Sequence, residues 1–164
     1  MRILISPCLI GICTRWDGSC EEIEELTDLV KSGQAVFMCP EQIGGMSTPR
    51  EPSETEPGKT AQDVLNGEAK VKSITGKDVT REFVVGAERI LRFCQAMGVE
   101  IAILKSDSPS CGSVKTYDGT FTSTIIPGKG IAAELLEQNG IKVYNEENFW
   151  TSGGVRMSGR AELQ

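Results

Sequence analysis

Three cysteines stand in similar surroundings and are the side chains best suited to chemistry. Each follows a short apolar run and precedes a loop rich in Pro, Gly or Ser. The three are Cys8, Cys39 and Cys111. Thiolates bind zinc and iron–sulfur clusters, and three protein ligands leave one position of a metal site open for a substrate. The competing interpretation is that each is a small buried residue, because free cysteine is common in protein cores.

The composition limits the rest of the chemistry. The chain has 164 residues, no histidine and a formal net charge of −6. Without histidine the usual general base and the commonest zinc ligand are missing. Acid–base work therefore falls to Asp, Glu, Cys, Lys, Tyr or water. An acidic domain lacks the basic surface of a nucleic-acid binder, so we expect no duplex nucleic acid partner.

The apolar runs are short. None approaches the ~20 residues of a membrane span, and Ile3-Leu4-Ile5 is too short for a signal peptide. We therefore expect a cytoplasmic protein without a membrane partner. In that compartment the six cysteines serve as metal ligands, catalytic groups or core residues more often than as disulfides.

The elements that must position the cysteines alternate between strand and helix. The buried strands are expected at Arg2–Ser6, Ala35–Met38, Glu100–Lys105 and Ile141–Tyr144. The helices are expected at Glu21–Ser32, from a cap at Asp78 to Met97, and at Gly130–Asn139. This alternation predicts a single α/β, Rossmann-like domain with a mainly parallel sheet and helices on both faces. In such sheets the ligand site lies at the carboxyl ends of the strands, where each of the three cysteines is expected.

The remaining segments are less regular. Pro40–Gly67 is a long stretch with four prolines, which indicates either a functional lid or a surface loop. Glu68–Ile74 is expected to be an edge strand, and Val114–Tyr117 with Thr120–Ile126 a hairpin on an Asp-Gly turn. We expect one domain over residues 1–148 and a loosely structured tail over 149–164.

A succession of motifs along almost the whole chain carries a family resemblance. The motifs are Ser6-Pro7-Cys8-Leu9-Ile10-Gly11, Cys13-Thr14-Arg15-Trp16-Asp17-Gly18, Cys39 to Arg50, Gly76-Lys77-Asp78-Val79-Thr80, Leu104 to Gly112, and Tyr117 to Thr122. In this order they resemble the thiouracil desulfidase family. The chain departs from the family pattern at Trp16, where Tyr is expected, and at Met46, where Leu is expected. Neither departure touches a proposed ligand.

The resemblance implies an enzyme that removes sulfur from thiouracil, or from a related thiolated pyrimidine base or nucleotide, without net redox change. It implies a [4Fe–4S] cluster held by Cys8, Cys39 and Cys111, whose fourth iron binds the thione sulfur. Water then attacks the thiocarbonyl carbon and hydrosulfide is released. The family's catalytic residues fall on Glu41 and Ser108.

The residues themselves are compatible with these roles. A chain without histidine needs a carboxylate for proton transfer, and Glu41 is close in sequence to a proposed ligand. Ser108 could hydrogen-bond a pyrimidine oxygen or a water, or could be only a turn residue before Pro109. Two rival functions remain at this stage. One is a non-enzymatic module that binds zinc or an iron–sulfur cluster, and the other is a cluster enzyme acting on a different sulfur compound.

Other candidates receive structural interpretations. Asp17 is expected to form a turn with Gly18 rather than to support the ligand residues, and Arg50 to lie on the surface rather than to bind a phosphate of a nucleotide substrate. Cys94 falls on the apolar face of its helix, and Cys13 and Cys20 are expected to be inert free thiols. The segment Gly128-Lys129-Gly130-Ile131-Ala132-Ala133 matches a G-x-G-x-x-A pattern without the βαβ context of a dinucleotide site. A phosphate at that helix N-terminus stays open.

Overall fold

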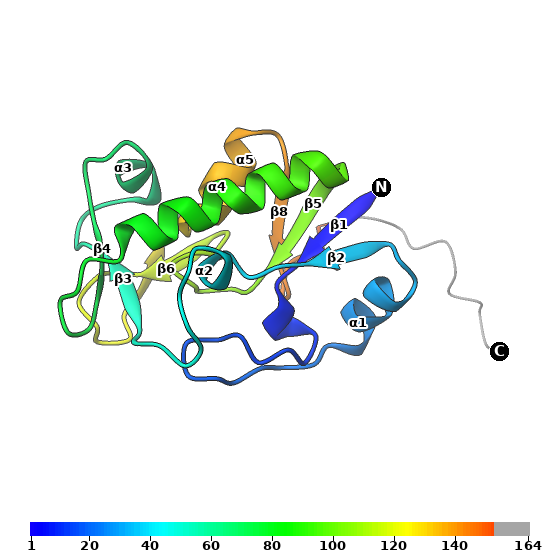
Figure 1. The fold of residues 1–164 in the computed structure, drawn as a ribbon, viewed down its shortest axis with the longest axis horizontal. Helices are drawn as coiled ribbons and strands as arrows, with labels where there is room; N and C mark the ends of the chain where they lie inside the picture. The colour runs from blue at the N-terminus through cyan, green and yellow to red at the C-terminus, as the bar shows by residue number, and fades with distance from the viewer. Residues whose placement is uncertain (153–164) are drawn as a thin grey trace.

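The centre of the fold is a parallel sheet of four strands, seen in a computed structural model that describes residues 1–152 (Figure 1). The order across the sheet is β2-β1-β5-β8. The bounds are Arg2–Ile5 for β1, Ala35–Phe37 for β2, Val99–Leu104 for β5 and Lys142–Asn145 for β8. The four predicted buried strands are confirmed, and all three pairings between them are parallel.

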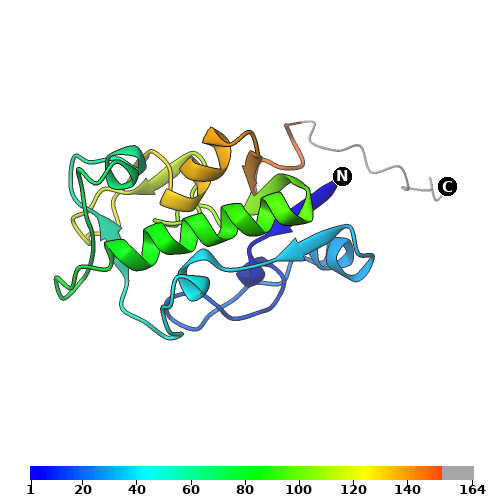
Figure 2. The ribbon, with the colours of Figure 1, turned by 45° about the horizontal axis from the view of Figure 1, so that its top comes forward.

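Alternate residues of the strands face opposite sides of the sheet, because side chains in a strand alternate. Ile3 and Ile5 of β1 pack with α1 (Glu24–Lys31) on one face. Leu4 packs on the other face with α4 (Thr80–Met97) and α5 (Ile131–Gln138). The prediction of helices on both faces is confirmed. Figure 2 shows the long helix α4 crossing one side of the molecule.

The strand order fixes where a ligand site should lie. The chain runs from β1 outward to β2, and then returns to the other side of β1 to form β5 and β8. The direction of winding therefore reverses between β1 and β5, and doubly wound sheets bind their ligands at such a reversal. This order belongs to doubly wound sheets in general. It does not single out the six-stranded Rossmann arrangement that "Rossmann-like" suggests.

The stretch predicted to be irregular, Pro40–Gly67, contains regular elements, so that prediction was wrong. It holds α2 (Pro40–Ile43), β3 (Ser53–Thr55) and α3 (Ala61–Leu65). These elements are too short to show periodicity in the sequence, but local signals support them. Pro40 begins α2 and Thr60 forms a capping box at α3.

Two small antiparallel ribbons lie outside the main sheet. β3 pairs with β4 (Val71–Ser73), which falls within the predicted edge strand. β6 (Lys115–Tyr117) pairs with β7 (Ile125–Pro127), so the hairpin is confirmed but its loop is longer than an Asp-Gly turn. Asp118 accepts hydrogen bonds from the backbone amide and hydroxyl of Thr120, which opens a wider loop.

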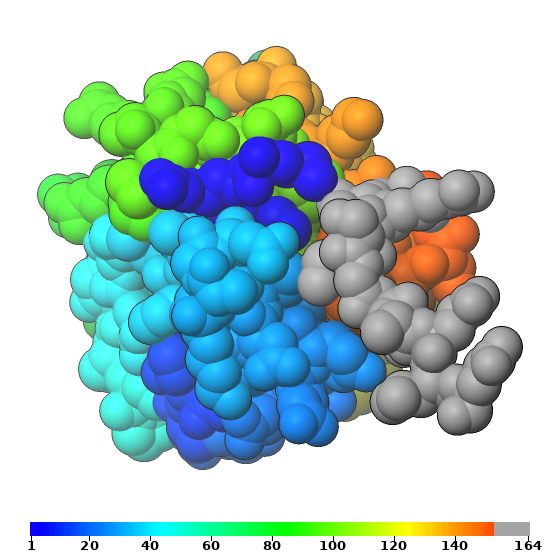
Figure 3. Space-filling model, turned by 90° about the vertical axis from the view of Figure 1, so that its right-hand side faces the viewer, coloured from blue at the N-terminus to red at the C-terminus, as the bar shows by residue number. Residues whose placement is uncertain are grey.

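The helix ends differ from the predictions for local reasons. α1 begins at Glu24 rather than Glu21, because Glu22 forms a bridge with Ile10 instead. α4 begins at Thr80, and Asp78 accepts hydrogen bonds from the Thr80 amide and hydroxyl before the helix starts. The left-handed Gly98 ends α4 as expected. Figure 3 shows the N-terminal residues between the end of α4 and the segment that links α1 to β2.

The chain continues to pack beyond residue 148. Phe149, the first residue of the predicted tail, is 1% exposed and belongs to the core beside α1. The part of the tail from 153 to 164 lies outside the described residues. Within residues 1–152, no helix is both long enough and apolar enough to cross a membrane.

Candidate iron–sulfur and substrate site

A pocket of about 320 Å³ opens at the carboxyl ends of β1, β2 and β5. It is lined by all five residues that the sequence pointed to. These are Cys8, Cys39, Glu41, Ser108 and Cys111. The pocket therefore lies at the reversal point of the sheet, where the fold predicts a ligand site.

Cys8 and Cys39 are each placed by a short helix that starts with proline. Cys8 lies in η1 (Pro7–Leu9), a single 3₁₀ turn directly after β1, and is 7% exposed. Cys39 is the N-cap residue of α2 and is partly buried. Because the proline ring fixes φ at the first helical position, the backbone directly after Cys39 and directly before Cys8 is held rigidly where the chain leaves the sheet.

Cys111 is held by its own loop and by the start of α5. The Ser108 hydroxyl accepts hydrogen bonds from the backbone amides of Ser110 and Cys111, both at 3.2 Å. The first amides of α5 donate to carbonyl oxygens of the same loop, at Pro109 and Ser110. These amides are therefore used inside the protein. The open possibility of a phosphate at this helix N-terminus is not supported.

Burial raises the pKa of all three thiols. The pKa of Cys8 rises to about 11, first through burial and then through the neighbouring Cys39 thiol, while Arg15 and Lys105 oppose the rise. Burial also raises the pKa of Cys39, against a backbone hydrogen bond from Gln42. For Cys111 burial is again the largest cause, followed by Cys39. All three thiols line the same pocket, so their charged forms also disfavour one another there.

Glu41 is held at both carboxylate oxygens. Its Oε2 accepts from Arg50 Nε at 2.5 Å, and its Oε1 accepts from the Ser110 hydroxyl at 2.7 Å. The predicted surface position of Arg50 was wrong, because its side chain is only 7% exposed. Arg50 is fixed further by the carbonyl oxygens of Ser47 and Thr14. A buried carboxylate whose two oxygens both have hydrogen-bond partners is held in one fixed position.

Sequence reasoning missed Ser110. Its hydroxyl lies 3.1 Å from that of Ser108 and 3.6 Å from Cys111 Sγ, in addition to its bond to Glu41. A continuous chain of polar groups therefore joins Ser108 to Glu41. The available signal was a second serine in Ser108-Pro109-Ser110-Cys111, directly before the cysteine. Ser108 was predicted to be either a turn residue or a pocket residue, and it is both, because its hydroxyl accepts from the Cys111 amide and the residue lines the pocket.

Two glycines allow α2 to lie directly against α4. A Cβ atom on Gly44 would lie 2.1 Å from the Glu82 carbonyl oxygen, and one on Gly86 would lie 2.1 Å from the Pro40 carbonyl oxygen. Both distances are far below van der Waals contact. The backbones of the two helices therefore touch, and this contact places α2 with Cys39 and Glu41 at its start.

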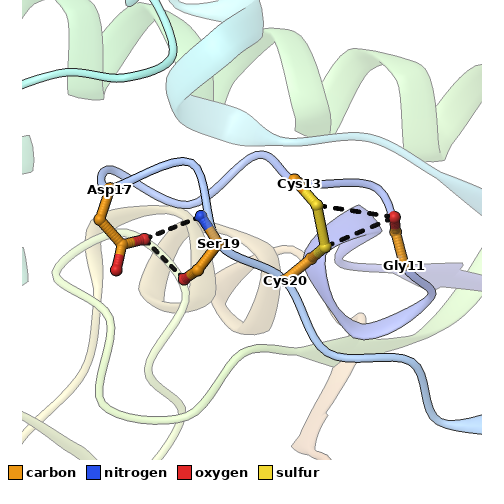
Figure 4. Close-up of a disulfide and its surroundings, with 5 residues drawn as sticks. All are labelled: Gly11, Cys13, Asp17, Ser19 and Cys20. Atoms are coloured by element: carbon orange, nitrogen blue, oxygen red, sulfur yellow. Dashed lines mark hydrogen bonds between the residues drawn. A yellow bond between two sulfur atoms is a disulfide. The ribbon is translucent and has the colours of Figure 1, made fainter.

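Cys13 and Cys20 form a disulfide, so their prediction as free thiols was wrong (Figure 4). The loop doubles back through a turn from Arg15 to Gly18 and brings their Cα atoms to 4.4 Å. Both Sγ atoms contact the Gly11 carbonyl oxygen, at 3.8 and 3.5 Å. The sequence separation of seven residues gives no sign of this.

The same loop reaches the pocket. Thr14, Arg15 and Trp16 line it. Asp17 accepts hydrogen bonds from the amide and hydroxyl of Ser19, which confirms its interpretation as a turn residue (Figure 4). The hydrogen bond also lowers the pKa of the Asp17 carboxyl, with the Ser19 hydroxyl as the largest cause.

A second ion pair includes a residue that lines the pocket. Lys105, at the end of β5, pairs with Glu146, which also accepts from the amide and hydroxyl of Ser106. These contacts join the segment after β8 to Lys105 and Ser106, which follow β5 and line the pocket. Cys94, in contrast, is fully buried in α4 away from the pocket, as predicted.

The three pocket cysteines are not disulfide-bonded, and they are not arranged for a single metal ion. Among residues 1–152, no group of three or more Cys, Asp or Glu side chains has the geometry to hold one ion. A cubane differs because each thiolate binds a different iron, so its ligands stand further apart than those of a single ion. Three free thiols that line one pocket are the donor set that a cluster with one open iron requires.

The family of this chain is identified by a comparison with models of known protein families. The family model described as 2-thiouracil desulfurase matches residues 3–148.

The chain belongs to the 2-thiouracil desulfurase family.

The chain is also similar to two individual proteins. It is 46% identical to the uncharacterized protein YbbK of Bacillus subtilis (strain 168) over 147 residues, which cover 90% of this chain and 97% of that protein. It also resembles a solved structure of the [4Fe–4S]-dependent thiouracil desulfidase TudS. That match has a TM-score of 0.79 and 39% identity, and covers 90% of this chain and 91% of that one.

Proposed function

We propose that the protein hydrolyses the carbon–sulfur bond of a thiolated pyrimidine, with a [4Fe–4S] cluster held by Cys8, Cys39 and Cys111. The observation that carries this proposal is the shared pocket. Three free thiols, a carboxylate held by Arg50 and two serines all face one enclosure at the reversal point of the sheet. The family membership and the likeness to TudS support the same activity.

The cluster, when bound, would supply an iron with an open position that acts as a Lewis acid toward the thione sulfur. The protein supplies the rest. Burial of the pocket limits access of bulk water, so that a single water can be placed against the thiocarbonyl carbon. Lys105 and Arg15 place positive charge near Cys8, which favours the charged thiolate form of this ligand.

Glu41 carries the proton in this proposal. Its carboxylate accepts a proton from the attacking water, either directly or through Ser110, whose hydroxyl already donates to Glu41. Each serine in the relay gives one proton and receives one. The proton on Glu41 then passes to the departing sulfur, which leaves as hydrosulfide, and the second proton of the water is released to solvent as the carbonyl of the oxo base forms, so that no oxidation state changes. Arg50 holds the carboxylate in place throughout.

The substrate must be flat and small. Trp16, Tyr117 and Phe121 line the pocket and offer aromatic surfaces to a pyrimidine ring. These side chains fit thiouracil or a related thiolated pyrimidine, and they do not choose between a base and a nucleotide.

Metal analysis of anaerobically reconstituted protein, together with sulfide release, tests the proposal. We expect about four iron and four sulfide per chain, and release of sulfide from thiouracil. Alanine at Cys8, Cys39 or Cys111 should each abolish iron retention, while alanine at the buried Cys94 should leave it unchanged. One zinc per chain without sulfide would instead support a zinc-binding module and overturn the proposal.

A further inference from the structure

A second buried carboxylate lines the pocket and has no role in the proposed chemistry. Glu54, in the middle of β3, is 7% exposed and lines the same enclosure as the three cysteines. A carboxylate removed from water is costly unless hydrogen bonds replace its hydration. Its partners therefore show what the site is built to do.

Only one of the two Glu54 oxygens is used. Oε2 accepts from the backbone amides of Gly119 at 2.8 Å and Phe121 at 3.2 Å. Within residues 1–152 the structure gives Oε1 no hydrogen-bond partner, and this atom is not sealed from solvent. Glu41 differs, because both of its oxygens are bonded. Glu54 therefore keeps one acceptor without a protein partner, on a residue that lines the pocket.

The loop that holds Glu54 is built for this contact. Gly119 has a φ of +90°, and a Cβ there would lie 2.4 Å from the Thr55 carbonyl oxygen, so only glycine fits against β3. Phe121 has a left-handed φ of 58°, which is unusual for a bulky residue. The loop therefore accepts backbone strain in order to aim two amides at one carboxylate oxygen.

Glu54 approaches the pocket from the end away from the central sheet. Along the long axis of the molecule, β3 and β1 lie on opposite sides of α2, in both Figure 1 and Figure 2. Cys8 follows β1, whereas Glu54 lies on β3 beside Tyr117 and Phe121 of the hairpin. A ring with its sulfur toward the cysteines would present its opposite edge to Glu54.

We infer that Glu54 Oε1 accepts a hydrogen bond from the substrate at the ring position opposite the thiocarbonyl carbon. This inference rests on the proposed function. In a pyrimidine, N1 lies opposite C4, and it carries N–H in the free base or a ribose in a nucleoside. C5 lies opposite C2 and carries only C–H. Glu54 therefore selects 4-thiolated pyrimidines over 2-thiolated ones, through N1–H or through a ribose hydroxyl.

Glu54→Gln replaces the unpaired acceptor oxygen with an NH₂ donor and hardly changes the shape of the side chain. The glutamine oxygen can still accept from Gly119 and Phe121, so that its NH₂ faces the pocket as a donor. The matched control is Glu56→Gln, two residues further along the chain and just after β3. Glu56 also accepts from a backbone amide, that of Lys70, but does not line the pocket. Iron content is measured first to show that both variants keep the site intact.

Binding is measured by titration calorimetry and turnover by sulfide release, with 4-thiouracil, 2-thiouracil, 1-methyl-4-thiouracil and 4-thiouridine. We expect Glu54→Gln to weaken binding of 4-thiouracil and raise its KM by roughly 10- to 100-fold, as for loss of a hydrogen bond to a charged group. Its kcat should change little. 2-Thiouracil and 1-methyl-4-thiouracil have no hydrogen-bond donor at the ring position opposite the thiocarbonyl carbon, so their binding should be unaffected in the variant. Glu56→Gln should match wild type with all four compounds.

The comparison of 4-thiouridine with 1-methyl-4-thiouracil tells the ribose hydroxyl from N1–H as the donor. If wild type favours 4-thiouridine over 1-methyl-4-thiouracil and Glu54→Gln loses that preference, a ribose hydroxyl is the donor. Equal binding of all four compounds by wild type and Glu54→Gln overturns the inference, as does equal weakening of all four. Discrimination in binding without any sulfide release would keep the inference and refute the proposed reaction instead.

Discussion

Arg50 Nε lies 2.5 Å from Glu41 Oε2, and the two side chains are 7% and 11% exposed. Arg50 joins Glu41 to the distant loop at Thr14, because its other donors bind the Thr14 carbonyl oxygen and that of the neighbouring Ser47. Its backbone amide also donates to the Trp16 carbonyl oxygen at 2.8 Å. The position of the proposed proton carrier therefore depends on a residue nine positions away.

Replacement of this arginine should damage turnover without removing iron. Arg50→Lys keeps the charge but loses the planar fork that reaches Glu41, Thr14 and Ser47 together. We expect kcat to fall by about 10²-fold, the usual effect of misplacing a catalytic group, with unchanged iron content. Arg50→Ala leaves the Glu41 carboxylate buried without its partner, which should lower the free energy of unfolding by about 3–5 kcal/mol.

The control for Arg50→Lys is Arg81→Lys on the exposed side of α4. Chemical denaturation and turnover per intact cluster are measured on both proteins. Normal kcat in Arg50→Lys would mean that the fork does not position Glu41.

Glu41 itself is tested by a substitution of equal shape. Glu41→Gln can still accept from Ser110 or Arg50 but carries no proton, so we expect turnover to fall by roughly 10²–10⁴-fold with the cluster retained. Ser110→Ala breaks the relay and leaves Glu41 Oε1 without its hydrogen-bond donor. Ser108→Ala should have a smaller effect, since it leaves the bond between Ser110 and Glu41 in place.

Single-turnover measurements on equally reconstituted proteins compare these three variants. If Glu41→Gln turns over at a nearly normal rate, the proton is carried elsewhere, and water or another pocket group takes the role.

Much of the fold could be predicted because its core strands are apolar and its long helices are periodic. The apolar residues Leu4 and Ile5 are enough to predict the buried strand β1. Phe83, Ala87 and Ile90 have the spacing of one helical face, which predicts α4. The three cysteines could be predicted to meet because all of them follow strands of one parallel sheet. Their positions depend on topology, which the alternation of strand and helix already indicates.

The parts that could not be predicted depend on contacts between distant segments. Arg50 has the sequence context of a surface loop, and its burial follows only from Glu41 and Thr14. Ser110 and Glu54 acquire their roles from partners at residues 41 and 119. The short elements between residues 40 and 67 have fewer than two helical turns or strand repeats, so no period could reveal them.

The contact between α2 and α4 predicts a loss of stability from a substitution that normally stabilises helices. Gly86→Ala gains helix propensity, but its Cβ would lie 2.1 Å from the Pro40 carbonyl oxygen. We expect the free energy of unfolding to fall by about 1–3 kcal/mol, as for an overpacked core. Because Pro40 follows Cys39, iron retention should fall as well.

Denaturation and iron analysis of Gly86→Ala are compared with Glu88→Ala, an exposed substitution on the same helix. The control should stay within about 0.5 kcal/mol of wild type. Unchanged stability in Gly86→Ala would show that α2 moves away at little cost.

The disulfide should support the loop and not the cluster. The double substitution Cys13→Ser with Cys20→Ser opens a loop whose ends are seven residues apart. Loop-closure entropy predicts a loss of about 2–3 kcal/mol in the free energy of unfolding. Iron content should not change. Loss of iron from this variant would instead make Cys13 or Cys20 a cluster ligand.

The most direct test of the central claim is the origin of the oxygen in the product. The reconstituted protein is mixed anaerobically with 4-thiouracil in ¹⁸O-labelled water, without any electron donor or acceptor. Hydrolytic desulfuration predicts one hydrosulfide for each base converted, and uracil that carries one ¹⁸O at the former thione position. Unlabelled uracil, or conversion only after an electron donor is added, would contradict the account.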